Sequence, residues 1–153
     1  MKALTALAAV LALFVAVTVA PKTARAAEDS SWTTDYQNAL QTAKNEKKMV
    51  LLDFTGSDWC GWCMKLDKEV FSTPEFKDFA AKNLVLVKVD FPRSVQQTAA
   101  VKAQNQKLAQ QYKIEGYPTI IVLNADGKPV GELGYEPGGP SAFIGKLKTL
   151  PQS

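Results

Sequence analysis

Apolar and polar residues follow two rhythms along the chain, and each rhythm predicts one type of element. Continuous apolar runs rich in strand formers predict buried strands at residues 49–54, 84–90 and 119–124. Apolar residues at helical spacing predict amphipathic helices around these strands. The predicted helices cover residues 32–45, a stretch from the cysteines through Val70, a helix opened by Ser-Thr-Pro-Glu at 72–75, residues 95–112 and residues 141–150.

The order of these elements predicts an α/β fold. Strands that alternate with helices predict parallel pairing in one sheet. Asp126 followed by Gly127 predicts a hairpin, so that the next segment, PVGELGY, becomes an antiparallel edge strand. A length of 153 residues suits one domain.

The first 26 residues differ from the rest of the chain. Lys2 precedes an apolar run of about 18 residues, and Ala24-Arg25-Ala26 provides a small-x-small cleavage signal. We therefore expect residues 1–26 to be a cleaved secretory signal peptide and residues 27–153 to be the mature domain. The alternative is a retained membrane anchor, because the run is just long enough to span a bilayer. Both interpretations place the domain outside the cytoplasm, in the periplasm or otherwise exported, with membrane contact only if the segment is kept.

The charge of the predicted mature domain argues against nucleic-acid binding. The full chain has a formal net charge of +3, and residues 1–26 contain three basic residues and no acidic residue. The remainder is close to neutral, with Arg93 as its only arginine. A nucleic-acid-binding surface needs clustered basic residues, so we expect no nucleic-acid partner.

The two cysteines, Cys60 and Cys63, are the main candidates for chemistry. A disulfide across so short a loop stabilises a fold by only roughly 2 kcal/mol in the chain-entropy model, which makes a structural staple a poor interpretation. A zinc site needs three or four protein ligands, and the chain has two cysteines and no histidine. We therefore expect no metal and no cofactor. The lack of histidine also excludes Cys–His and Ser–His–Asp catalysis.

The position of Cys60 favours thiol–disulfide exchange. It follows a predicted strand and a glycine-containing turn, so it lies at the first turn of a helix. Unpaired N–H groups and the helix dipole at that point favour a thiolate, and such a setting lowers a cysteine pKa from about 8.5 by one to several units. A partner one helical turn away can close a disulfide with little rearrangement.

Two segments resemble the thioredoxin superfamily. WCGWC after LLDF, and YKIEGYPTIIVLNADGK about 50 residues further on, are similar to that family's motif and to its downstream proline segment. The longer stretch WCGWCMKLDKEVF followed by STPEF resembles exported thioredoxin-like members, including the reductase domain of DsbD-type proteins. The resemblance covers residues 32–150. It implies a thioredoxin fold, with a mixed central sheet flanked by helices, an N-terminal helix and an antiparallel hairpin edge.

The resemblance also implies roles for individual residues. Cys60 is expected to be the attacking thiolate and Cys63 the resolving thiol of a redox disulfide. Pro118 matches the family's cis-proline, which borders the active site and lets the backbone of the preceding residue pair with an extended substrate. Asp53 matches the family's buried acid. Burial would raise its pKa and let it exchange a proton with Cys63.

Four neighbours of these residues are expected to contact substrate: Trp59, Gly61, Trp62 and Tyr117. The two tryptophans have packing against the domain as an equal alternative. The pair between the cysteines, Gly61 and Trp62, differs from the Gly-Pro of thioredoxin. Met64 replaces a lysine that often follows the second cysteine in the family.

The resemblance implies a monomeric thiol–disulfide oxidoreductase that reduces protein disulfides outside the cytoplasm. Its electron donor is expected to be a membrane thiol reductase. The alternatives are a thioredoxin-like binding module, a disulfide donor for exported proteins, and a thiol reductase that prepares cysteines of another protein for copper or haem.

Overall fold

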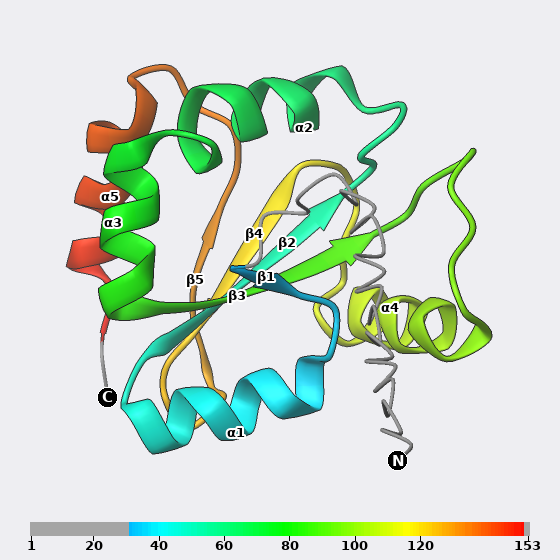
Figure 1. The fold of residues 1–153 in the computed structure, drawn as a ribbon, viewed down its shortest axis with the longest axis horizontal. Helices are drawn as coiled ribbons and strands as arrows, with labels where there is room; N and C mark the ends of the chain where they lie inside the picture. Colours follow the sequence, from blue (N-terminus) through cyan, green and yellow to red (C-terminus); the bar gives the residue numbers. More distant parts are fainter. Residues whose placement is uncertain (1–30, 152–153) are drawn as a thin grey trace, which may run out of the picture.

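The central strand of the sheet is β2 (Met49–Thr55), which is buried along its whole length. The computed structural model describes residues 31–151, and these form a five-stranded mixed sheet in the order β1-β3-β2-β4-β5 (Figure 1). The other strands are β1 (Trp32–Thr33), β3 (Leu84–Asp90), β4 (Thr119–Leu123) and β5 (Pro129–Leu133). The helices are α1 (Tyr36–Glu46), α2 (Gly61–Leu66), the π-helical turn η1 (Asp67–Phe71), α3 (Pro74–Asn83), α4 (Ala99–Gln111) and α5 (Gly139–Thr149).

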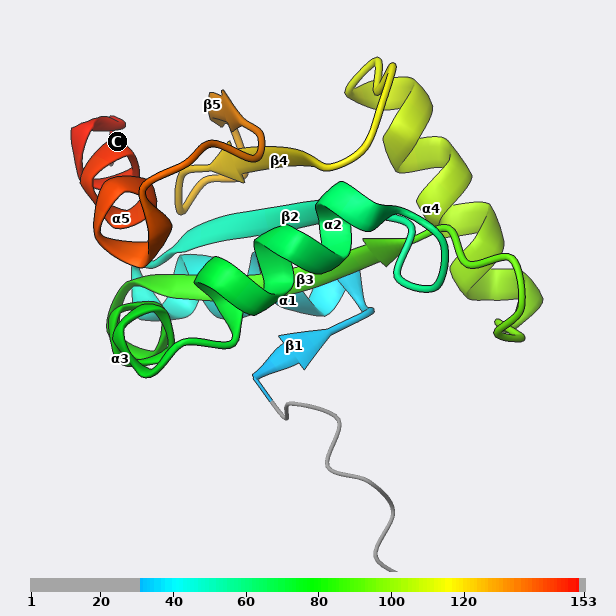
Figure 2. The ribbon, with the colours of Figure 1, turned by 90° about the horizontal axis from the view of Figure 1, so that it is seen from above.

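Helices cover both faces of the sheet, so the molecule has three layers (Figure 2). Successive side chains of a strand point to opposite faces, and the two faces of β2 accordingly enter two separate cores. Leu51 packs with residues from α2, η1, α3 and α5. Leu52 packs with residues from α1 and α4 on the other face. A strand that is covered on both faces explains the unbroken apolar run in the sequence.

The pairing of β4 differs from the parallel pairing expected for the third apolar run. β2 is parallel to β3 but antiparallel to β4, with Asp53 opposite Ile120. The predicted hairpin is present, because β5 is antiparallel to β4 and Gly127 has a φ of 79° in the connecting turn. The thioredoxin fold, with its mixed sheet and antiparallel edge, is confirmed.

Capping explains why two helices begin later than the sequence predicts. α1 begins at Tyr36, because the Asp35 carboxylate accepts the Asn38 N–H at 2.9 Å and caps the helix there. α4 likewise begins after Thr98, which leaves residues 91–98 as a connecting segment. The helix that contains the cysteines changes to π geometry at η1.

The predicted start of the first helix is instead an edge strand. Trp32 pairs with Leu86 of β3 in parallel register, and its ring lies 5.2 Å from that of Phe71. The prediction of a signal peptide at residues 1–26 falls outside the described residues. Within residues 31–151, none of the helices has both the length and the apolar character needed to cross a membrane.

Candidate active site

The cysteine pair lies where β2 ends and α2 begins, at the top of the view in Figure 1. Cys60 and Cys63 form a disulfide, and their Cα atoms are 5.2 Å apart. The chain reaches Cys60 through the 56–59 turn, in which the Cys60 N–H donates to the Gly56 carbonyl at 2.8 Å. The turn therefore fixes the first cysteine at the N-terminus of the helix.

The backbone of α2 is arranged to stabilise charge on Cys60. Cys60 is the N-cap residue, and the Cys63 N–H donates to its Sγ at 3.2 Å. In the reduced protein the same N–H and the helix dipole would favour the Cys60 thiolate over the thiol. Burial does not distinguish the two cysteines, because Cys60 is 6% exposed and Cys63 is 5% exposed. The N-cap position of Cys60 is what favours a thiolate there and not at Cys63.

Gly56 is required by the packing of Trp59. A Cβ atom at position 56 would lie 2.4 Å from the Trp59 indole, which is far inside contact distance. The absence of a side chain therefore lets the Trp59 ring fold back over its own turn. This explains why a glycine stands between the strand and the cysteine motif.

Trp59 belongs to an aromatic wall beside the disulfide. Its Nε1–H donates to the Phe91 carbonyl at 2.8 Å, and its ring meets that of Tyr117 edge-on at 5.7 Å. The Arg93 guanidinium lies over the same indole, 4.1 Å from the ring centroid. Trp59 therefore packs against the domain. A direct contact between Trp59 and a substrate stays a prediction.

Two carboxylates hold the 56–59 turn against the end of β3 and the 91–98 segment that follows it. Asp58 accepts the backbone N–H groups of Arg93, at 2.9 Å, and Ser94, at 2.6 Å. Asp90 accepts the Ser57 N–H at 2.9 Å and the Ser57 hydroxyl at 2.6 Å. The Arg93 N–H is the main cause that holds the pKa of Asp58 below its ordinary value. We call this pair of contacts the Asp58–Asp90 clamp.

Trp62 stands between the two cysteines in the sequence and is 58% exposed. Its ring packs against that of Tyr135 at a centroid distance of 5.1 Å. Trp62, Pro118, Tyr135 and Pro137 line a hollow of about 400 Å³, which we call the Trp62–Tyr135 pocket. An exposed aromatic next to a reactive disulfide is suited to contact a partner protein.

The bond between Tyr117 and Pro118 is cis, as the motif predicts. Tyr117 is half-buried between Trp59 and Phe91, and burial raises the pKa of its phenol. Gly61, by contrast, is the first residue of α2 and has open space where a Cβ would be. The substrate contacts expected of Gly61, Tyr117 and Pro118 stay predictions.

Asp53 lies on β2 and is only 5% exposed. Strand alternation places its side chain on the same face as Leu51, which is the face covered by α2 and η1. Burial raises the pKa of Asp53 from 3.8 to about 7; the charge of Lys88, on the neighbouring strand, opposes this shift, and Asp67 and Asp90 add to it. The expected burial and direction of shift are present, whereas proton exchange with Cys63 stays a prediction.

Three residues that shape this surface were not predicted from the sequence: Asp58, Arg93 and Tyr135. Each acts through contacts between segments that are far apart in sequence, so no local pattern identifies them. Arg93 had one signal, because it is the only arginine after residue 26.

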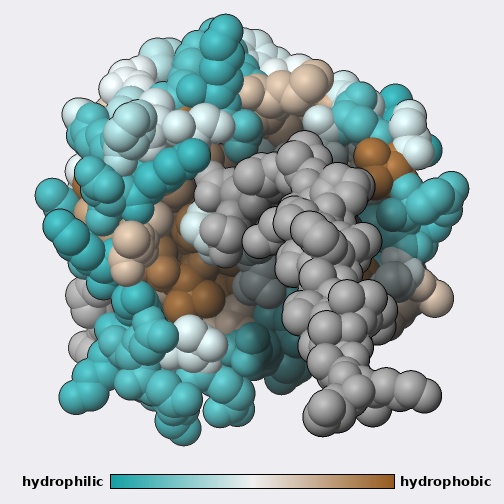
Figure 3. Space-filling model, viewed as in Figure 1, coloured by the Kyte–Doolittle hydropathy of each residue, from teal (hydrophilic) through white to brown (hydrophobic). Residues whose placement is uncertain are grey.

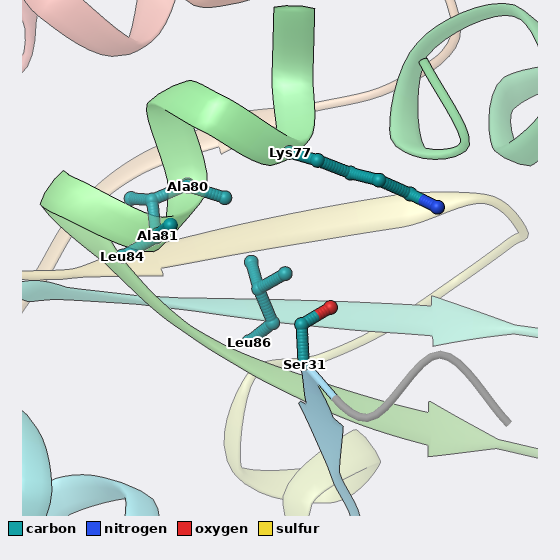
Figure 4. Close-up of a pocket in the computed structure, with 6 residues that line it drawn as sticks. All are labelled: Ser31, Lys77, Ala80, Ala81, Leu84 and Leu86. Atoms are coloured by element: carbon teal, nitrogen blue, oxygen red, sulfur yellow. The ribbon is translucent and has the colours of Figure 1, made fainter. Parts of the chain in front are cut away.

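A separate hollow of about 390 Å³ lies at the edge of the sheet, between α3 and β3 (Figure 4). It is lined by Ser31, Lys77, Ala80, Ala81, Leu84 and Leu86. Figure 3 shows apolar surface exposed in the same region among hydrophilic side chains. None of its lining residues is a nucleophile suited to redox exchange, so the disulfide end of the sheet is the candidate active site. In the part of the chain that the structure describes, no cluster of three or more metal-ligating side chains was found.

A mixed sheet flanked by helices, with a CxxC disulfide at a helix N-terminus and a cis-proline just before β4, defines the class of thioredoxin-fold redox proteins. The chain belongs to the family of thioredoxin-like domains, whose sequence model matches residues 36–149.

Individual relatives agree with this membership. The chain is 40% identical over 124 residues to the disulfide bond reductase DsbH of Chlamydia pneumoniae, a match that covers 81% of this chain and 74% of that protein. It is 35% identical over 96 residues to the thiol:disulfide interchange protein DsbD of Vibrio vulnificus strain CMCP6, where it covers 63% of this chain but 15% of DsbD. A solved structure of a DsbH oxidoreductase has 41% identity and a TM-score of 0.73, over 77% of this chain and 81% of that one. The chain is a thiol–disulfide oxidoreductase.

Proposed function

We propose that this oxidoreductase works as a reductase of protein disulfides outside the cytoplasm. The observation that carries the proposal is the Cys63 N–H that donates to Cys60 Sγ at the cap of α2, because it prepares one sulfur of the pair as a nucleophile. The similarity to a protein named disulfide bond reductase supports the direction of electron flow.

The proposed cycle begins with the reduced pair. The Cys60 thiolate attacks one sulfur of a substrate disulfide, which forms a mixed disulfide and releases the other substrate sulfur as a thiolate. Cys63 then loses its proton and attacks Cys60 Sγ. That step closes the Cys60–Cys63 disulfide and releases the second substrate sulfur, so two electrons have passed to the substrate.

Asp53 is the proposed proton acceptor for Cys63. Its pKa of about 7 leaves it partly deprotonated at neutral pH, which suits a group that accepts and returns a proton. The backbone at Tyr117 and Pro118 is the proposed contact for an extended substrate segment, with Trp59, Gly61 and Trp62 around it.

The partners follow from the cycle. The substrates are disulfide-bearing proteins, and the oxidised pair must be reduced again by a redox partner. We propose that this donor is a membrane thiol reductase, that residues 1–26 direct export and are removed, and that the domain acts as a monomer.

The reduction potential of the Cys60–Cys63 pair tests the direction. In glutathione buffers we expect a value near that of thioredoxin, about −270 mV. A value near that of the oxidant DsbA, about −120 mV, would instead make the protein a disulfide donor. A pair that never equilibrates with glutathione would support the binding-module alternative.

Trapping tests the roles of the two sulfurs. Cys63→Ser should accumulate mixed disulfides through Cys60 with an oxidised substrate protein, because the resolving step is lost. Cys60→Ser is the matched control and should trap far less. Equal trapping by both variants would contradict the assigned roles.

A further inference from the structure

The Trp62–Tyr135 pocket is assembled from three separate parts of the chain. Trp62 comes from α2, Pro118 from the residue before β4, and Tyr135 and Pro137 from the segment between β5 and α5. Trp62 stands between the two cysteines in the sequence, and Pro118 is the cis-proline of the proposed substrate contact. A substrate side chain in the pocket would therefore lie next to the residues that are proposed to hold the substrate cysteine.

The rings of the pocket are held in place without a ligand. The Tyr135 hydroxyl donates to Glu69 Oε2 at 2.7 Å. The Lys65 ammonium lies 5.1 Å from the Trp62 ring centroid and 5.0 Å from that of Tyr135. Lys65 and Glu69 also face each other, with a closest N–O distance of 3.9 Å. Preorganised rings lose little conformational freedom when a partner binds.

The π-helical turn η1 supplies part of this support. Its wide turn is marked by the Ser72 N–H, which donates to the Asp67 carbonyl at 2.8 Å across five residues. Glu69 lies inside η1, and its carboxylate meets Tyr135. Single π-turns occur frequently at functional sites, and here the turn carries the carboxylate that anchors the pocket.

We propose that Tyr135 determines substrate specificity, by forming with Trp62 a pocket that takes a bulky apolar side chain next to the substrate cysteine. The inference rests on the proposed reductase function and names the substrate class for that site. The occupant is a disulfide-bonded segment of a partner protein in which a residue such as Phe or Leu flanks the cysteine.

The chemistry of the lining favours an apolar side chain over a charged one. Two aromatic rings and two prolines provide the walls. A charged side chain placed against these apolar walls would lose hydration, whereas an apolar one gains contact with them. A volume of about 400 Å³ is near the lower end for ligand pockets, which suits one large side chain.

Two matched disulfide peptides test the inference. They are identical except that Phe or Ser flanks the cysteine, and the readout is the ratio of their kcat/KM values with the purified protein. We expect the protein to prefer the Phe peptide by roughly tenfold, mainly through KM. Tyr135→Ala should bring the ratio close to one, and Tyr135→Phe should keep most of the preference because the ring remains.

Val95→Ala is the control, since Val95 is exposed but does not line the pocket, and it should leave the ratio unchanged. A wild-type ratio near one, or a ratio that Tyr135→Ala leaves intact, would overturn the specificity role alone. Failure of the protein to reduce even glutathione disulfide would overturn the proposed function, and the inference with it.

Discussion

Asp53 combines a buried position with a charge that its surroundings disfavour. It stands on the central strand, and burial raises its pKa to about 7. Desolvation penalises the carboxylate more than the nearby Lys88 ammonium compensates. An uncharged side chain would be more stable at this position, so the acid is better explained by chemistry than by packing.

Replacing Asp53 with Asn should stabilise the protein at high pH. The native state keeps a proton that the unfolded state releases between pH 3.8 and about 7, so the wild type loses stability as the pH rises through that window. Asp53→Asn should remove this loss and raise the free energy of unfolding by as much as about 4 kcal/mol above the window.

Urea unfolding at about pH 4 and about pH 8 measures this difference. The exposed Asp78 on α3 gives the control Asp78→Asn, which should not change the pH dependence. A gain of equal size at both pH values would mean that the effect of Asp53→Asn is one of packing and not of charge.

The 56–59 turn and the 91–98 segment behave as one element, although one precedes the cysteines and the other follows β3. The Asp58 carboxylate accepts from the segment and the Trp59 indole donates to it, while Ser57 donates to Asp90 at the end of β3. Arg93 is thereby presented on the face of Trp59. The clamp places a positive charge beside the active site that the motif WCGWC itself lacks.

Asp58→Ala should remove the hydrogen bonds that hold the 91–98 segment against the 56–59 turn. The bond after Arg93 should then be cleaved several-fold faster by an arginine-specific protease, because local opening exposes it. Arg93 is the only such site after residue 26, so one new pair of fragments on a gel reports the event.

Asp78→Ala, at an exposed position on α3, is the matched control for that cleavage. Unchanged cleavage in Asp58→Ala would show that other contacts hold the segment. Because the Arg93 N–H lowers the pKa of Asp58, the contacts of Asp58 should persist at mildly acidic pH.

Elements that depend on local sequence patterns were predictable from the sequence. Elements and contacts that depend on residues far away in the sequence were not. The apolar runs predicted β2, β3 and β4 to within a residue, and the spacing of Cys60 and Cys63 predicted the site. The strand at Trp32 was missed because it depends on pairing with Leu86. Tyr135 was missed for the same reason, since only the folded chain brings it to Trp62.

At the scale of the whole molecule, the disulfide is peripheral to what holds the fold together. Two apolar cores, one on each face of the sheet, enclose the strands. The disulfide closes a loop at one end of the sheet with a sequence separation of three residues. A disulfide at this position can be broken and formed again in each cycle with little effect on the stability of the fold.

Reduction should therefore leave the protein folded. The chain-entropy model assigns so short a loop roughly 2 kcal/mol, so urea unfolding of the reduced and oxidised protein should differ by about that amount or less. The Cys60→Ser, Cys63→Ser double variant should behave like the reduced protein. Unfolding upon reduction alone would revive the staple interpretation.

Expression of the full chain in a Gram-negative host tests the proposed export. The mature protein in the periplasm should begin at Ala27, as measured by intact mass. Fractionation with the membrane at full-length mass would show that residues 1–26 remain as an anchor.

The position of β2 in the sheet also governs when the chain can fold. β2 takes one neighbour from β3 and the other from β4, whose last residue is Leu123. Until that residue leaves the ribosome, one edge of the central strand has no partner. Such non-local pairing delays folding and keeps apolar segments exposed. Chaperones that bind extended apolar segments should therefore recognise the nascent chain during that interval.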